Sequence, residues 1–183
     1  MRDSEVLEKK HPIPLAYFLT FHTYGTWLHG CEEGSVDHAH NAYGQPLLEK
    51  DSDRLRLEQA AMRQPIYLLD KPRRDCVLHT IQEVCAYRRW MLLAAHVRST
   101  HVHVVVHAKA LPEKVVADLK AYSSRRLTEA GYDDKDRKRW AVHASTRYLW
   151  DAQSADLAIQ YVVHEQGEPM AVFENMQKKV TFE

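Results

Sequence analysis

One short segment constrains the fold of this chain more than any other. From His101 to Ala108 the sequence reads HVHVVVHA, in which histidines occupy three of the alternate positions and valines the positions between them. Successive side chains of a β-strand point to opposite faces of a sheet, so His101, His103 and His107 share one face, and Val102, Val104 and Val106 share the other. The segment therefore predicts a strand that packs its valine face against helices and exposes a histidine face on the other side.

The sequence on both sides of this strand predicts an alternation of strands and helices. Further strands are expected at Leu15–Phe21, Trp90–Val97 and Arg147–Trp150, and helices at Asp75–Arg89, Leu111–Ala130 and Ser154–Gln166, with Ser154 as the N-cap of the last helix. This order is the split βαβ arrangement. We therefore expect an α+β fold with a ferredoxin-like or RRM-like antiparallel sheet, helices on one face and an additional C-terminal helix.

The length of 183 residues fits a single domain covering 1–183. Between Gly25 and about Pro72 the chain is rich in glycine, proline and polar residues, which predicts a long loop insertion with a short helix at Ser52–Met62. No apolar run approaches the length of a membrane helix, and the N-terminal MRDSEVLEKK is too charged for a signal peptide. We therefore expect a cytoplasmic protein that has no membrane partner.

Cysteine spacing and charge narrow the classes of site and partner. Cys31, Cys76 and Cys85 form no CxxC pair, so the sequence suggests neither a disulfide framework nor a thiolate zinc site. The formal net charge is zero, which by itself argues against a nucleic-acid partner. The charge is uneven, however, because residues 114–147 carry nine basic and five acidic side chains, whereas 148–183 carry two and six. This asymmetry fits a DNA groove, but it also fits a solvated surface, and charge alone does not decide.

The spacing of the histidines suggests metal chemistry. Two imidazoles two residues apart on one strand face can bind the same divalent ion, and His101 and His103 have that spacing. The alternative from spacing alone is an amphipathic strand whose polar face consists of histidines. Other histidines are expected to be surface or loop residues, namely His22, His29, His38, His40 and His79. A metal site would need a third ligand and a reacting group.

The predicted helix Ser154–Gln166 supplies candidates for both. Its apolar residues recur at helical spacing and form one stripe: Ala155, Ala158, Ile159, Val162 and Val163. Tyr161 and Glu165 lie one turn apart on the edge of that stripe, where the carboxylate can bind a metal while the phenol points at whatever the metal polarises. The alternative is a tyrosine at the edge of the core beside a solvated glutamate.

Four segments, in this order, carry a family resemblance. They are TFHTYGTWLHG (20–30), HVRSTHVHVVV (96–106), LKAYSSRRL (119–127) and AIQYVVHEQ (158–166). Together they resemble the HUH single-strand DNA transposases, in particular the single-tyrosine branch that includes the REP-associated tyrosine transposases and similar insertion-sequence transposases. Four ordered segments are more specific than the His-x-His pattern alone.

The resemblance implies roles for individual residues. It implies that Tyr161 is the nucleophile, that His101 and His103 bind Mg²⁺ or Mn²⁺, and that a third ligand lies one turn after the tyrosine, at Glu165. Members of the family commonly carry Gln or Asn at that last position, so Glu is a departure. Ser99-Thr100 likewise replaces the Pro-Asp or Pro-Asn that often precedes the first histidine.

The resemblance also implies a reaction and a substrate. The expected reaction is metal-dependent nicking and rejoining of single-stranded DNA through a covalent 5′-phosphotyrosine, on strands that carry a hairpin, in the nucleoid of the cytoplasm. Lys120, Arg125 and Arg126 are the expected phosphate contacts. Several aromatic residues are available to stack on bases, although core packing is the alternative for each: Tyr17, Tyr24, Trp27, Tyr122 and Trp150. In the family the tyrosine helix and the histidine strand can come from different subunits, so a homodimer stays open.

Two alternatives from other functional classes remain. The first is a phosphodiester hydrolase that uses the same histidines and a metal-bound water, with Tyr161 only orienting the substrate. The second is a noncatalytic nucleic-acid binder, since the split βαβ sheet is also the RRM architecture. The second alternative is disfavoured because the strand that would carry exposed aromatic residues carries histidines instead.

Overall fold

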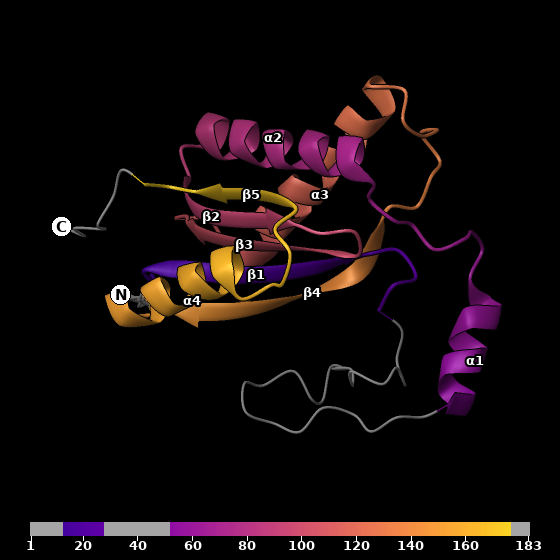
Figure 1. Ribbon diagram of the computed structural model, residues 1–183, viewed down its shortest axis with the longest axis horizontal. Helices are drawn as coiled ribbons and strands as arrows, with labels where there is room; N and C mark the ends of the chain where they lie inside the picture. Colours follow the sequence, from indigo (N-terminus) through magenta and orange to yellow (C-terminus); the bar gives the residue numbers. More distant parts are fainter. Residues whose placement is uncertain (1–12, 28–51, 177–183) are drawn as a thin grey trace, which may run out of the picture.

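The computed structural model describes residues 13–27 and 52–176. Its centre is an antiparallel sheet with the strand order β4-β1-β3-β2-β5 (Figure 1). The strands are β1 (Ala16–Thr23), β2 (Met91–Val97), β3 (His101–His107), β4 (Trp140–Leu149) and β5 (Ala171–Glu174). The helices are α1 (Ser52–Ala61), α2 (Lys71–Arg88), α3 (Pro112–Glu129) and α4 (Ala152–His164). The order of the first four strands is that of the split βαβ sheet, which confirms the predicted fold class.

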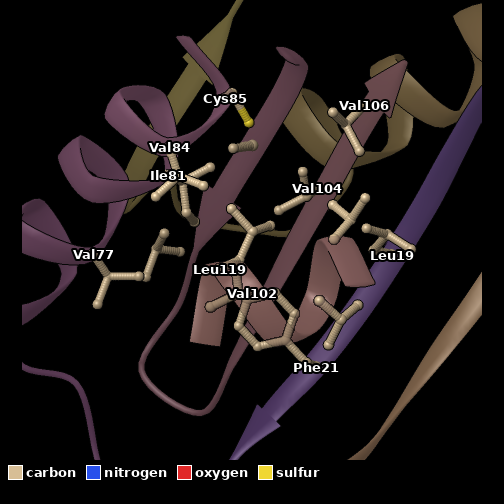
Figure 2. Packing of buried hydrophobic residues seen from close by; sticks show 14 of the residues in the cluster. Leu19, Phe21, Val77, Ile81, Val84, Cys85, Val102, Val104, Val106 and Leu119 are labelled. Carbon is tan, nitrogen blue, oxygen red and sulfur yellow. The ribbon is translucent and has the colours of Figure 1, made fainter. Parts of the chain in front are cut away.

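Helices α2 and α3 cover one face of the sheet and α4 lies on the other (Figure 1). The main core lies under α2 and α3, where the valine face of β3 packs as expected. Figure 2 shows Val102, Val104 and Val106 beside Leu19 of β1 and Leu119 of α3. All five side chains are completely buried, so the valine face fixes the position of β3 in the molecule.

A second, smaller core lies under α4. Ala155, Ala158 and Val162 of this helix pack against Leu93 of β2 and Val105 of β3, and all five are buried. The small alanine side chains let the helix approach the sheet closely. In the single chain, this packing brings the tyrosine of α4 to the histidine strand.

Two helices begin earlier than the sequence predicted, and capping is the reason. Asp70 caps α2 by accepting a hydrogen bond from the Arg73 amide, and Pro72 fits the first turn, so the helix begins at Lys71 and not at Asp75. Asp151 caps α4 by accepting from the amide and hydroxyl of Ser154. Ser154 as the N-cap is therefore wrong.

The two strands that differ from the sequence prediction, β4 and β5, are the edge strands of the sheet. Strand β4 begins at Trp140, well before the predicted Arg147, and strand β5 was not predicted. Each pairs on one side only in the strand order, so each buries few side chains and lacks the apolar signal of a central strand. The pairing that defines them is non-local and cannot be read from their own residues.

The structure tests part of what the sequence predicted about the insertion, the cysteines and membrane helices. The short helix in the insertion is confirmed as α1, but residues 28–51 of the predicted loop lie outside the described residues, and the single-domain assignment stays a prediction. Cys85 is buried, as expected of a packing residue, and burial raises the pKa of its thiol to about 12. In the described part of the chain, none of the helices has the length and apolar character needed to cross a membrane.

Candidate active site

Strand β3 and helix α4 bring the predicted histidines and tyrosine together. The His101 and His103 rings lie 4.7 Å apart between centroids, on the α4 face of the sheet. The Tyr161 ring lies 5.8 Å from the His103 ring and 5.9 Å from the Phe18 ring of β1. Tyr161 is 40% exposed, so its phenol borders both the histidine pair and solvent.

Two threonine hydroxyls orient the histidine rings. Thr20 lies opposite His103 in the β1–β3 pairing, and its Oγ1 is 2.8 Å from the Nδ1 atom of His103. The Oγ1 atom of Thr100 is 3.0 Å from the Nδ1 atom of His101. With Nδ1 held in both rings, each histidine presents its Nε2 atom to the site. Such outer hydrogen bonds are what fix the orientation of histidine ligands in metal sites.

Gln166, which the sequence did not predict as a site residue, contacts both His103 and the end of the tyrosine helix. Its amide oxygen lies 3.1 Å from the Nε2 atom of His103, and its amide nitrogen donates to the Tyr161 carbonyl at 3.3 Å. An amide oxygen only accepts, so Nε2 of His103 carries the proton in this arrangement and Nδ1 accepts from Thr20. Gln166 thus links the tyrosine helix to the histidine strand.

Glu165, the expected third ligand, lies at the C-terminal end of α4. Helix α4 ends at His164, and Glu165 is its C-cap, with an exposed side chain. The Glu165 amide still donates to the Tyr161 carbonyl at 3.2 Å, so its backbone lies one turn after the tyrosine, but it is the next side chain, Gln166, that reaches His103. A Gln beside the expected position was the available signal, because amide side chains are common at that position in the resembling family.

Burial keeps the histidines neutral. Burial, with the charge of Arg98, lowers the pKa of His101 to about 4, and burial, with His101 nearby, lowers the pKa of His103 to about 3. At neutral pH both imidazoles are therefore uncharged, which is the form of histidine that binds a cation. Two imidazoles and an amide oxygen suit a first-row divalent ion. Across residues 13–27 and 52–176 no three His, Cys, Asp or Glu side chains form a group that could hold a metal ion. The third oxygen or nitrogen donor beside the two histidines is therefore the amide of Gln166.

His22 belongs to this region, although the sequence placed it on the surface. It lies opposite His101 in the β1–β3 pairing, with the ring centroids 5.6 Å apart. Trp27 stacks on the His22 ring at 4.5 Å. Burial, with His101 nearby, lowers the pKa of His22 to about 4. Only the register between β1 and β3 reveals this convergence.

The sequence profile described as "Transposase IS200 like" matches residues 61–162. This range covers more than half of the chain and includes both histidines and Tyr161. The chain belongs to the IS200-like transposase family. Gln166 lies just beyond the matched range.

Two solved structures are similar to this chain. One is a REP-associated tyrosine transposase bound to a REP hairpin, with 11% sequence identity and a TM-score of 0.47 over 82% of this chain. This chain spans 65% of the length of that protein. The other is a Deinococcus radiodurans R1 protein assigned as a transposase, with 15% identity and a TM-score of 0.43, covering 88% of this chain and 95% of that one. No curated protein sequence matches the chain.

A buried histidine holds helix α4, which carries Tyr161, on the sheet. His96 of β2 is completely buried, and its Nδ1–H donates to the Val162 carbonyl of α4 at 3.0 Å. Its Nε2 atom accepts from the Met170 amide at 3.2 Å. One imidazole therefore satisfies a carbonyl of the last helical turn and an amide of the segment that leads to β5.

The three predicted phosphate contacts lie on α3, across the sheet from the histidine pair. Lys120 donates from Nζ to the carbonyls of residues 141, 142 and 143 at 2.8, 3.3 and 3.1 Å, and burial lowers its pKa to about 8. Arg126 pairs with Glu83 and Glu129, and the Arg125 guanidinium lies over the Tyr122 ring. Lys120 thus ties α3 to β4 and Arg126 ties α3 to Glu83 of α2, and the structure does not bring these side chains to Tyr161.

Proposed function

We propose that this transposase nicks and rejoins single-stranded DNA, with Tyr161 as the nucleophile and with His101 and His103 as ligands of Mg²⁺ or Mn²⁺. The observation that carries the proposal is the position of the Tyr161 ring, 5.8 Å from the His103 ring and partly exposed. A phenol beside a pair of neutral, hydroxyl-oriented imidazoles is a suitable arrangement for phosphoryl transfer to tyrosine.

The bound cation would polarise the scissile phosphate and offset the charge that develops on its oxygens. The protein's own contribution is orientation. To bind a cation through Nε2, His103 would carry its proton on Nδ1, and Nδ1–H would then donate a hydrogen bond to the Thr20 hydroxyl. The Thr20 hydroxyl can accept as well as donate, so it holds the ring in both states. The Thr100 hydroxyl can hold the His101 ring through Nδ1 in the same two ways.

Tyr161 supplies the covalent step. Its phenol oxygen loses a proton and bonds to phosphorus, while the bond from phosphorus to the 3′ oxygen breaks and that oxygen leaves as a hydroxyl. The product is a 5′-phosphotyrosine, which keeps the phosphodiester bond energy. Attack by another 3′ hydroxyl reverses these changes and rejoins strands without ATP.

We assign the third ligand to Gln166, in the place that the resemblance gave to Glu165. The support is the 3.1 Å separation of its amide oxygen from His103 Nε2, together with the exposed side chain of Glu165. Titrating Mn²⁺ into the Gln166→Ala and Glu165→Ala variants separates the two assignments. We expect the affinity to fall about tenfold or more for Gln166→Ala and to change little for Glu165→Ala. The opposite order would assign the ligand to Glu165.

The test of the proposed function is a covalent adduct. The protein is incubated with Mn²⁺ and a 5′-blocked, 3′-labelled single strand that carries a hairpin, and denaturing gels are inspected for a protein-linked band. We expect the band in the native protein and its loss in Tyr161→Phe and in His103→Ala. A matched control is Tyr87→Phe on α2, a position that is 76% exposed, and it should behave like the native protein.

The same assay separates the alternative chemistry. A hydrolase that uses a metal-bound water would cleave the strand without a protein-linked band, and its cleavage would survive Tyr161→Phe. A noncatalytic binder would retain the strand with no cleavage and with no dependence on Mn²⁺. Either result would refute the proposed function.

A further inference from the structure

Contacts between the segment after α4 and strand β2 block one side of the site around Tyr161. Gln166 bridges His103 and the end of α4, and Arg98 donates to the Glu168 carbonyl at 3.2 Å. Together with the His96 contacts, these bonds join the segment after α4 to β2. A DNA strand therefore cannot approach Tyr161 over β2 while these contacts hold, and its approach lies on the opposite side, over β1 and β4.

The pairing of β1 with its two neighbours places polar side chains along that approach. Ser145 of β4 lies opposite Thr20, which in turn lies opposite His103, and directly opposed residues of a sheet point to the same face. Arg147 lies opposite Phe18, whose ring contacts Tyr161. Ser145 is about two strand spacings, or about 10 Å, from His103. We call Thr20, Ser145 and Arg147 the β1–β4 surface.

The β1–β4 surface is open and suited to an anion. Ser145 and Arg147 are exposed, because α4 packs toward β2 and β3 and reaches β1 and β4 near Ala16, Phe18 and Leu149. Neither β1 nor β4 contains an Asp or Glu residue. The charge of Arg147 also contributes to the lowered pKa of Asp151, a carboxylate that accepts from the amide and hydroxyl of Ser154 at the N-terminus of α4.

We propose that the DNA strand reaches Tyr161 across the β1–β4 surface, where Arg147 binds a phosphate that flanks the scissile one. This inference rests on the proposed function and names where its substrate lies. Arginine and hydroxyl side chains are the usual donors to phosphate oxygens, and they bind the backbone without reading bases. The surface is continuous with the metal-binding histidine through Thr20, so a bound strand would run directly into the site.

The experiment measures binding without cleavage. All variants carry Tyr161→Phe, and the dissociation constant of a fluorescent single strand is determined with Mn²⁺ at several salt concentrations. We expect Arg147→Ala to weaken binding about tenfold and to reduce the slope of log K against log salt by about 0.7, the value for one phosphate contact on a single strand. Arg147→Lys should keep the slope.

A matched pair of charge insertions tests the surface itself. Ser145→Glu adds a negative charge on the β1–β4 surface, and Leu111→Glu adds the same charge at a position that is 72% exposed at the start of α3, on the other side of the sheet. We expect Ser145→Glu to weaken binding about tenfold and Leu111→Glu to leave it within twofold. Equal effects of the two insertions, or an unchanged salt slope in Arg147→Ala, would overturn the proposal.

The outcomes distinguish this inference from the proposed function. A native protein that forms the covalent band while Ser145→Glu and Arg147→Ala bind normally would refute only the β1–β4 surface. Weakened binding in both variants, with no covalent band in the native protein, would support the surface and refute the nicking chemistry. Thermal unfolding of each variant identifies any loss of affinity that follows from loss of folding.

Discussion

Replacement of His96 is expected to loosen the tyrosine helix and to lower stability substantially. His96→Ala removes a completely buried side chain and leaves the Val162 carbonyl and the Met170 amide without their partner. Each lost hydrogen bond costs about 1 kcal/mol, and the space left by the ring adds a similar amount, so the free energy of unfolding should fall by about 3 kcal/mol. With a urea m-value of about 2 kcal/mol/M, the midpoint should fall by about 1.5 M.

His96→Asn provides the matched control for this prediction. An asparagine amide can still donate to the Val162 carbonyl from nearly the same position as Nδ1, so we expect about half the loss of stability. Urea unfolding monitored by tryptophan fluorescence measures both variants. A midpoint shift below about 0.3 M for His96→Ala would refute the reasoning, because it would mean that the two contacts contribute almost nothing.

Three further predictions concern pH, a strained residue and subunit organisation. Since folding lowers the pKa of His101 to about 4 and of His103 to about 3, the unfolded chain binds more protons below about pH 6.5, and urea unfolding of the metal-free protein should show stability falling from pH 6.5 toward pH 4. Arg89, at the C-cap of α2, has a φ of 57°, so Arg89→Gly should raise the unfolding free energy by about 0.5 kcal/mol, and a lower melting temperature would contradict this. Mixing Tyr161→Phe with His103→Ala should restore no covalent adduct, since both residues come from one chain; a restored band would indicate subunits that exchange α4.

Local patterns account for what could be predicted of the fold. The alternation from His101 to His107 specifies a strand with two different faces, and the structure buries the valines under α2 and α3 and turns the histidines toward α4. The apolar stripe of α4 is likewise confirmed, because the residues of a helical stripe are close in sequence. Such patterns carry the order of the elements and hence the fold class.

The third donor shows where local patterns stop being sufficient. Helical spacing from Tyr161 predicts Glu165, but the helix ends at His164, and the chain then turns Gln166 back toward His103. The end of a helix depends on capping and on what the next segment contacts. Here that next segment contacts β2 through His96, and neither partner is near the other in sequence.

The sequence by itself determined the two-faced strand, the tyrosine helix and the order of elements that joins them, because these depend on side chains a few positions apart. Only the tertiary structure decided that Thr20 orients His103, that His22 approaches His101, and that Lys120 faces backbone carbonyls and not the site. Those relations depend on strand register and on which face each helix covers. Both are set by packing between distant segments, so no window of the sequence contains them.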